Sequence, residues 1–127
     1  MTDRAAIEET IRLYAAAWAK GDREGWLDTF AESAMQEDPI GEGVRRGRDE
    51  IGGFWDRAMA SYESLEIVPR DLFIVNAEAA LEWTLNGVTP EGMITFNGVD
   101  VFTFDAAARI LSVRAYWERA RISSQRS

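Results

Sequence analysis

The residue with the most specific chemistry in this sequence is Asp100, which interrupts the apolar segment 96–104. Because side chains alternate between the faces of a strand, Asp100 shares its face with Phe102 and Phe104. Raising an aspartate pKa from ~3.9 to above neutrality takes roughly 4 kcal/mol, which burial without a cation can supply. A carboxyl group kept neutral in this way can donate a hydrogen bond to an oxyanion. The alternative is a salt-bridged or edge-strand aspartate, for which Arg114 on the neighbouring strand is the candidate partner.

Two further residues are candidates for chemistry, and each has a purely structural alternative. Tyr14 lies on the buried stripe of a predicted helix, where a tyrosine also serves as core packing with its hydroxyl group at the rim. Asp38 directly precedes Pro39 in a predicted turn, where a short carboxylate commonly accepts backbone N–H bonds. Taken one at a time, neither residue decides between the two interpretations.

The sequence contains neither Cys nor His, and this absence removes whole classes of chemistry. Ser-His-Asp and Cys-His nucleophile systems, disulfide exchange, and zinc or copper sites built on imidazole or thiolate are excluded. Residues 41–47 are glycine-rich but lack the Gly-Lys-Ser/Thr of a P-loop, and no segment has the acidic spacing of an EF-hand loop. What remains is carboxylate, phenol, amine and guanidinium chemistry, with no metal site expected.

Length and charge limit the fold and its partners. The 127 residues, 46% of them hydrophobic, predict one domain over residues 1–127 that buries a core and a small-molecule cavity. The net charge of −8 disfavours nucleic acid and anionic membrane surfaces as partners. No apolar run approaches the ~20 residues of a membrane span, and residues 1–4 lack a signal-peptide pattern. We therefore expect a cytoplasmic protein.

The first half of the chain has helical periodicity. Asp22 is predicted to cap a second, short helix, and a third helix runs from about Arg48 to Ser61. Between these two helices, a short strand over residues 34–38 leads into a turn at residues 39–41. Apolar residues at spacings of four, three and four predict a first, amphipathic helix that ends near Lys20: Ile7, Ile11, Tyr14 and Trp18.

From residue 65 onward the pattern predicts strands over residues 65–74, 79–88, 92–104 and 110–119. Helices followed by an antiparallel sheet predict an α+β fold, with the helices on one face of a curved sheet. Gly98 within the third of these strands is interpreted as a bulge. The tail at residues 123–127 is expected to fray.

In order and spacing, these features resemble the bacterial ketosteroid isomerases, and the resemblance covers nearly the whole chain. The segments that carry it are Tyr14-Ala15-Ala16, Gly21-Asp22, Thr29-Phe30-Ala31, Glu37-Asp38-Pro39-Ile40-Gly41, Gly53-Phe54-Trp55, Asp100-Val101-Phe102-Thr103-Phe104 and Val113-Arg114-Ala115-Tyr116-Trp117.

The resemblance implies a fold, a reaction and roles for three residues. The implied fold is the cone of nuclear-transport-factor-2-like proteins, in which three N-terminal helices pack on a curved, mainly antiparallel sheet around an apolar pocket, usually in a homodimer. The implied reaction moves the double bond of a Δ5-3-ketosteroid to Δ4 through a dienolate, without a cofactor. Asp38 would carry the proton, and Tyr14 and protonated Asp100 would donate hydrogen bonds to the ketone oxygen. The implied apolar wall consists of Phe30, Phe54, Trp55, Met59, Phe102 and Trp117.

The sequence also departs from the family pattern. Trp55 stands where many isomerases have a tyrosine that bonds the catalytic tyrosine, and an indole accepts no hydrogen bond. Phe30 likewise lacks a hydroxyl group that some members have, so we expect a thinner polar network behind Tyr14. The alternative function is a steroid- or polyketide-binding protein on the same scaffold with little or no catalysis. Three arginines, Arg45, Arg46 and Arg48, are interpreted as solvated loop residues rather than as a site for an acidic group on the substrate.

Overall fold

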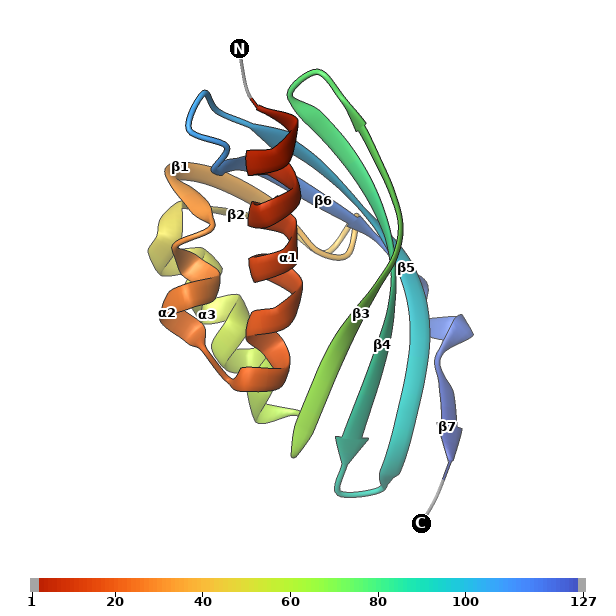
Figure 1. Ribbon diagram of the computed structural model, residues 1–127. Coiled ribbons are helices and arrows are strands. Elements are labelled where there is room, and N and C mark those ends of the chain that lie inside the picture. Colours follow the sequence, from red (N-terminus) through yellow and green to blue (C-terminus); the bar gives the residue numbers. More distant parts are fainter. Residues whose placement is uncertain (1–2, 126–127) are drawn as a thin grey trace.

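Three helices cover the concave face of a long, curved sheet in the computed structural model, which describes residues 3–125 (Figure 1). Residues 1 and 2, which belong to the N-terminal segment without a signal pattern, lie outside the described residues, as do residues 126 and 127. In chain order the elements are α1 (Arg4–Lys20), α2 (Arg23–Leu27), β1 (Phe30–Glu37), β2 (Val44–Arg46), α3 (Gly47–Ala60), β3 (Ser64–Val75), β4 (Glu78–Thr89), β5 (Gly92–Phe104), β6 (Ile110–Tyr116), the short 3₁₀ helix η1 (Arg119–Arg121) and β7 (Ser123–Gln125).

Local chemistry sets the bounds of the first two helices. The Asp3 carboxylate accepts a hydrogen bond from the Ala5 N–H and caps the start of α1. The helix ends at Gly21, whose φ of 64° is left-handed and favours glycine. The Asp22 carboxylate accepts from the Gly25 N–H at 3.0 Å, so the predicted cap of α2 is confirmed. The predicted amphipathic stripe of α1 is buried as expected.

The sheet has the strand order β2-β1-β6-β5-β4-β3, and β7 pairs with β5. All neighbouring strands are antiparallel except β1 and β6, which run parallel. The predicted α+β fold with a curved, mainly antiparallel sheet is therefore confirmed. The parallel pair places the end of β1 beside the end of β6. Residues 37–38 therefore lie next to residues 114–117, although these segments are far apart in the sequence.

Two predictions about strands are wrong. Gly98 does not form a bulge, because β4 and β5 pair in unbroken register with Gly98 opposite Trp83. Glycine is required there for another reason: a Cβ atom would lie 2.4 Å from Cζ2 of the Trp83 indole, which crosses over this position. The tail does not fray at Ser123–Gln125, because these residues pair with residues 93–95 of β5. The last long strand also ends earlier than predicted, at Tyr116, where the chain turns into η1.

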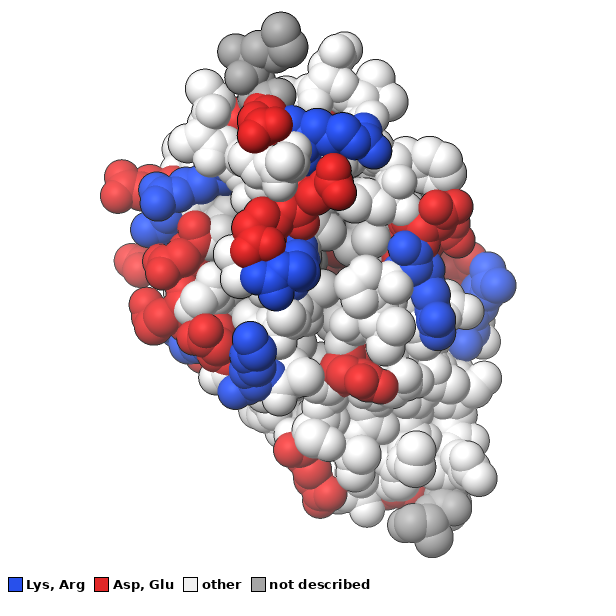
Figure 2. Space-filling model, viewed as in Figure 1, with Lys and Arg blue, Asp and Glu red and all other residues white. Residues whose placement is uncertain are grey.

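The hydrophobic core lies between the helices and the concave face of the sheet. Aromatic rings dominate its centre, including Trp18, Trp26 and Phe30. Charged side chains cover the outside of the helical layer in Figure 2, where acidic and basic residues are intermixed. In the described part of the chain, no helix has both the length and the apolar character needed to cross a membrane.

Candidate active site

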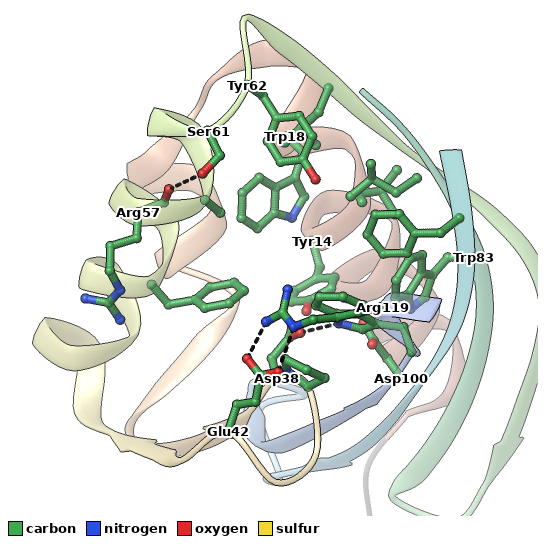
Figure 3. Close-up of a pocket in the computed structure, with 18 of the residues that line it drawn as sticks. Tyr14, Trp18, Asp38, Glu42, Arg57, Ser61, Tyr62, Trp83, Asp100 and Arg119 are labelled. Atoms are coloured by element: carbon green, nitrogen blue, oxygen red, sulfur yellow. Dashed lines mark hydrogen bonds and ion pairs between the residues drawn. The ribbon is translucent and has the colours of Figure 1, made fainter. Parts of the chain in front are cut away.

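A cavity of about 400 Å³ opens between the helices and the sheet (Figure 3). Three ionisable groups lie at one end of it, Tyr14 from α1, Asp38 from the loop after β1, and Asp100 from β5. Most of the remaining wall is apolar or aromatic: Trp18, Pro39, Phe54, Ala58, Leu65, Ile67, Trp83, Leu85, Phe96 and Trp117. Apolar walls with a few convergent polar groups are typical of a binding site for a small organic molecule.

Asp100 is almost completely buried, with 4% of its surface exposed. It sits in the middle of the sheet, opposite Leu81 of β4 and Ala115 of β6. The alternative of a cation partner is wrong, because Arg114 pairs instead with Glu37, at 3.4 Å. The Oδ1 atom of Asp100 has no hydrogen-bond partner among the described residues.

This environment keeps Asp100 protonated at neutral pH. Burial raises its pKa to about 8, and the negative charge of Asp38 acts in the same direction. The side chains of Trp83 and Tyr14 lower the pKa but do not outweigh burial. A carboxyl group that is neutral at pH 7 can donate a hydrogen bond into the cavity.

Asp38 has a different environment from Asp100. It is half-buried, directly before the cis peptide bond to Pro39, and its Oδ1 accepts a hydrogen bond from Trp117 Nε1 at 2.8 Å. Burial raises its pKa to about 6, while the Trp117 N–H and the charge of Arg45 act against that rise. At neutral pH Asp38 is therefore mostly ionised and can accept a proton.

The structural alternative for Asp38 was a carboxylate that satisfies the backbone of the turn. The structure assigns that task to its neighbour instead: Glu37 Oε2 accepts from the Gly41 N–H at 3.0 Å. The Asp38 carboxylate is thereby left to face the cavity, held through one oxygen by Trp117.

Tyr14 completes the group of ionisable side chains. Its ring packs against Trp26, Phe30 and Phe102, with centroid distances of 5.8, 5.9 and 5.3 Å. Burial and the nearby charges of Asp100 and Asp38 raise the pKa of the phenol well above its usual value. The hydroxyl group therefore keeps its proton and remains a hydrogen-bond donor over the physiological range.

Two of the six residues predicted for the apolar wall, Phe54 and Trp117, line the cavity. The other four do not line it, and the prediction is corrected for them, because they lie behind the lining residues. Phe30 and Phe102 pack against the ring of Tyr14, while Trp55 stacks on Trp18 at 4.0 Å. Met59 is half-buried against the core. Trp55 therefore does not take the place behind Tyr14 that the family comparison suggested.

The interpretation of the three arginines as solvated loop residues holds only for Arg46, which is exposed. Arg45 is half-buried in the cavity wall, with its guanidinium carbon 4.8 Å from the centre of the Phe54 ring. Arg48 donates two hydrogen bonds to the Phe30 carbonyl oxygen, at 2.6 and 3.2 Å.

Several lining residues were not singled out from the sequence. Phe96 could have been found, because it shares the strand face of Asp100 by simple alternation, and Trp83 and Leu85 occupy the matching face of β4. No pattern in the sequence pointed to five further lining residues: Glu42, Arg57, Ser61, Tyr62 and Arg119. Within residues 3–125, no group of three or more Asp and Glu side chains is placed to hold a metal ion.

An exposed ion pair lies in the cavity wall, beside Asp38 in Figure 3. Arg119 donates two hydrogen bonds to Glu42, and its guanidinium carbon lies 5.0 Å from the centre of the Trp117 ring (Figure 3). Trp117 in turn holds Asp38. A chain of contacts thus connects the loop after β1 with the segment after β6, and it fixes the carboxylate of Asp38 against the cavity.

Comparison with known proteins shows the family and the fold of the chain. The model of a family described as SnoaL-like domain matches residues 11–113. A steroid Delta-isomerase from Nocardioides simplex is 28% identical over 113 residues, which cover 89% of this chain and 90% of that protein.

Two solved structures have the same fold over nearly their full length. The Δ5-3-ketosteroid isomerase from Mycobacterium sp. is 26% identical, with a TM-score of 0.83 over 94% of this chain and 98% of the other. SalBIII, an epoxide hydrolase/cyclase-like enzyme with a role in forming the pyran ring of the polyether salinomycin, is 25% identical. Its TM-score is 0.88 over 98% of this chain and 100% of the other.

Proposed function

The chain belongs to the SnoaL-like domain family, and from this premise we propose that it is a Δ5-3-ketosteroid isomerase. The observation that carries the proposal is the opposite protonation of two aspartates at one cavity. Asp38 has a pKa of about 6 and Asp100 a pKa of about 8, so that one is a base and the other an acid at neutral pH.

In the proposed reaction, the Asp38 carboxylate removes a proton from the carbon between the ketone and the alkene of the substrate. The electron pair of that C–H bond moves into the ring system and leaves a dienolate, whose negative charge lies on the former ketone oxygen. Neutral Asp38 then returns the proton two carbons away, which places the double bond in conjugation with the ketone. The proton is moved within the site, and the enzyme ends in its starting state.

Tyr14 and Asp100 act on the oxygen that becomes negative. Both side chains are almost fully buried, at 4% exposure each, and both hold a proton at neutral pH. Donors that are fixed in an apolar cavity stabilise a developing oxyanion more than they stabilise the neutral ketone, and this difference lowers the barrier. As the proton reaches Asp38, the negative charge passes from that carboxylate to the oxygen between the two donors.

The pKa of Asp38 suits a base that must both take and return a proton. A general base works best when its pKa lies near the operating pH, because a much stronger base is already protonated and a much weaker one accepts poorly. Burial brings Asp38 up to this range, and the Trp117 N–H prevents it from rising further.

A cavity of about 400 Å³ lies within the size range that encloses drug-sized organic molecules, and its apolar wall fits a compact hydrocarbon skeleton. The proposal includes a cytoplasmic homodimer that works without a cofactor, as the sequence and the family resemblance lead us to expect. Analytical ultracentrifugation of the purified protein checks the dimer.

The test of the function is an isomerase assay with 5-androstene-3,17-dione, followed by the ultraviolet absorbance of the conjugated product and run without added metal or nucleotide. Turnover that disappears in Asp38→Asn supports the proposal. The alternative, binding of a steroid or polyketide without turnover, is favoured if the steroid raises the melting temperature but is not converted. Failure of the steroid to bind or react contradicts both the isomerase and the steroid-binding protein, and leaves the polyketide as the ligand to be tested.

A further inference from the structure

Arg45 is an unusual residue to find in the wall of this cavity. Its guanidinium group stacks on Phe54 and is half-buried. Its two hydrogen bonds, to Gln36 Oε1 and to the Asp38 carbonyl oxygen, are both long, at 3.5 Å, and both acceptors are neutral. Among residues 3–125, no carboxylate lies within ion-pair distance of Arg45. None of its five N–H donors therefore has a carboxylate partner among these residues.

A second cation stands beside it. Arg57, from α3, also lines the cavity, and Figure 3 shows its side chain extending along the outer side of the helix. Burial is the main cause that lowers the pKa of Arg45, and the positive charge of Arg57 acts in the same direction. Arg57 also forms no ion pair within the described residues. Two like charges are thus held together at the mouth of a cavity, in a protein whose net charge is −8.

The carboxylates that face Arg45 are already engaged elsewhere. Glu42 is held by two hydrogen bonds from Arg119, and Asp38 accepts the N–H of Trp117. The charges of both carboxylates still act on Arg45. Because Arg119 pairs with Glu42, the ionised carboxylate of Asp38 is left to balance the positive charges of Arg45 and Arg57, and it can balance one of the two at most.

The ionisable residues of the cavity differ in their exposure to solvent. Tyr14 and Asp100 are 4% exposed and form the closed end, whereas Arg45 is half-buried and Arg57 exposed. The arginines therefore lie nearer to solvent than the two donors do, and Arg45 lies beside Asp38, whose carbonyl oxygen it contacts at 3.5 Å. A ligand whose ketone or phenol oxygen reaches the two donors can direct a carboxylate on its solvent side toward the arginines. An arginine fork matches the two oxygens of a carboxylate, and the pairing gains strength where water is partly excluded.

We propose that the cavity takes a steroid-like molecule that carries a carboxylate on the solvent side of its ketone or phenol, and that Arg45, assisted by Arg57, binds this carboxylate. The inference rests on the isomerase function proposed above and specifies its substrate class. An alternative role for Arg45 is to balance the charge of Asp38. An ion pair of that kind would bring the guanidinium group within bonding distance of the Asp38 carboxylate, and the described residues form no such pair.

The test compares two ligands that differ only in charge at one end: estradiol-17β-hemisuccinate and its methyl ester. Both present the same phenol to the closed end of the cavity. We expect the wild-type protein to bind the free acid about tenfold more tightly than the ester, as measured by calorimetry at low salt. In Arg45→Gln this preference disappears, and in Arg57→Gln it is reduced; the quantity compared is the ratio of the acid and ester affinities within each variant, in which a general change of the cavity wall cancels. Exposed Arg46 offers the matched control, and Arg46→Gln keeps the full preference.

The outcomes separate this inference from the function on which it rests. Equal affinities for acid and ester in the wild type, or an undiminished preference in Arg45→Gln, overturn the carboxylate site while leaving the isomerase intact. Failure of both ligands to bind overturns the steroid function and the inference together. Measurable binding of the ester to Arg45→Gln shows that the variant is folded, so that the loss of preference is a loss of one charged contact.

Discussion

The carboxyl groups of Asp38 and Asp100 line one cavity, and the negative charge of the first helps to keep the second protonated. Asp38 comes from the loop after β1, whereas Asp100 comes from the middle of β5. Burial raises the pKa of both, but the charge of Arg45 and the Trp117 N–H at 2.8 Å lower that of Asp38, whereas the negative charge of Asp38 raises that of Asp100 further. The difference in environment gives two residues of one type two chemical roles.

Removing the base tests its role in turnover. Asp38→Asn leaves the shape of the site intact but cannot accept a proton, so we expect the rate of isomerisation to fall about 10²–10⁴-fold with steroid affinity preserved. Steady-state kinetics and a phenol-binding titration measure the two effects. Glu37→Gln is the matched control, because that neighbouring side chain binds the Gly41 N–H and Arg114 rather than facing the cavity. Normal turnover in Asp38→Asn would show that the base is wrongly assigned.

The two pKa values predict a bell-shaped dependence of activity on pH. Asp38 must be ionised, so kcat/KM rises as pH increases through about 6; Asp100 must be protonated, so kcat/KM falls as pH increases through about 8. Asp100→Asn keeps an N–H donor at every pH and should lose the alkaline limb alone. A profile that stays flat from about pH 5 to about pH 9 would contradict both assignments.

The same groups make stability depend on pH. The folded-state pKa of Asp100, about 8, lies above the unfolded value of ~3.9, so the native state binds the extra proton between these values. The contribution of Asp100 to stability is therefore greatest at low pH and is lost as pH rises toward 8, by on the order of 4 kcal/mol between about pH 5 and pH 9. Urea unfolding of Asp100→Asn should show a much shallower loss above pH 6, where Asp38 has already titrated. Parallel curves for the two proteins would exclude a buried, protonated Asp100.

Gly98 is expected to be required by the indole that lies over it. A Cβ atom there would come within 2.4 Å of Trp83, so Gly98→Ala should destabilise the protein by about 1–3 kcal/mol. Chemical denaturation measures the change. In a Trp83→Leu background the same substitution should cost clearly less, and an equal cost in both backgrounds would mean that the indole is not the cause.

Much of the fold could be predicted because it depends on local patterns. The apolar spacing of α1 and the cap at Asp22 act within a few residues. The face of Asp100 follows from the two-residue alternation of a strand, which does not depend on what packs against it. The ordering of helices before strands was enough to indicate the α+β class.

The composition of the cavity wall could not be predicted in the same way. Phe102 and Phe96 share a strand face with Asp100, yet only Phe96 lines the cavity, because the ring of Tyr14 covers Phe102. Likewise, the packing of Phe54 from α3 against the Arg45 guanidinium group helps to bury Arg45. The contact between Asp38 and Trp117 joins residues 79 positions apart and depends on the parallel pairing of β1 with β6. Such contacts depend on the curvature of the sheet and on the seating of the helices.

The central claim is that Asp38 and Asp100 hold opposite protonation states at neutral pH, and a carbon-13 NMR titration of labelled aspartate carboxyl groups tests it directly. Asp38→Asn and Asp100→Asn assign the two signals. The account predicts one carboxyl group that titrates near pH 6 and a second near pH 8, with the second pKa falling when Asp38 is made neutral. Two carboxyl groups that both titrate near the ordinary value of ~3.9 would contradict it.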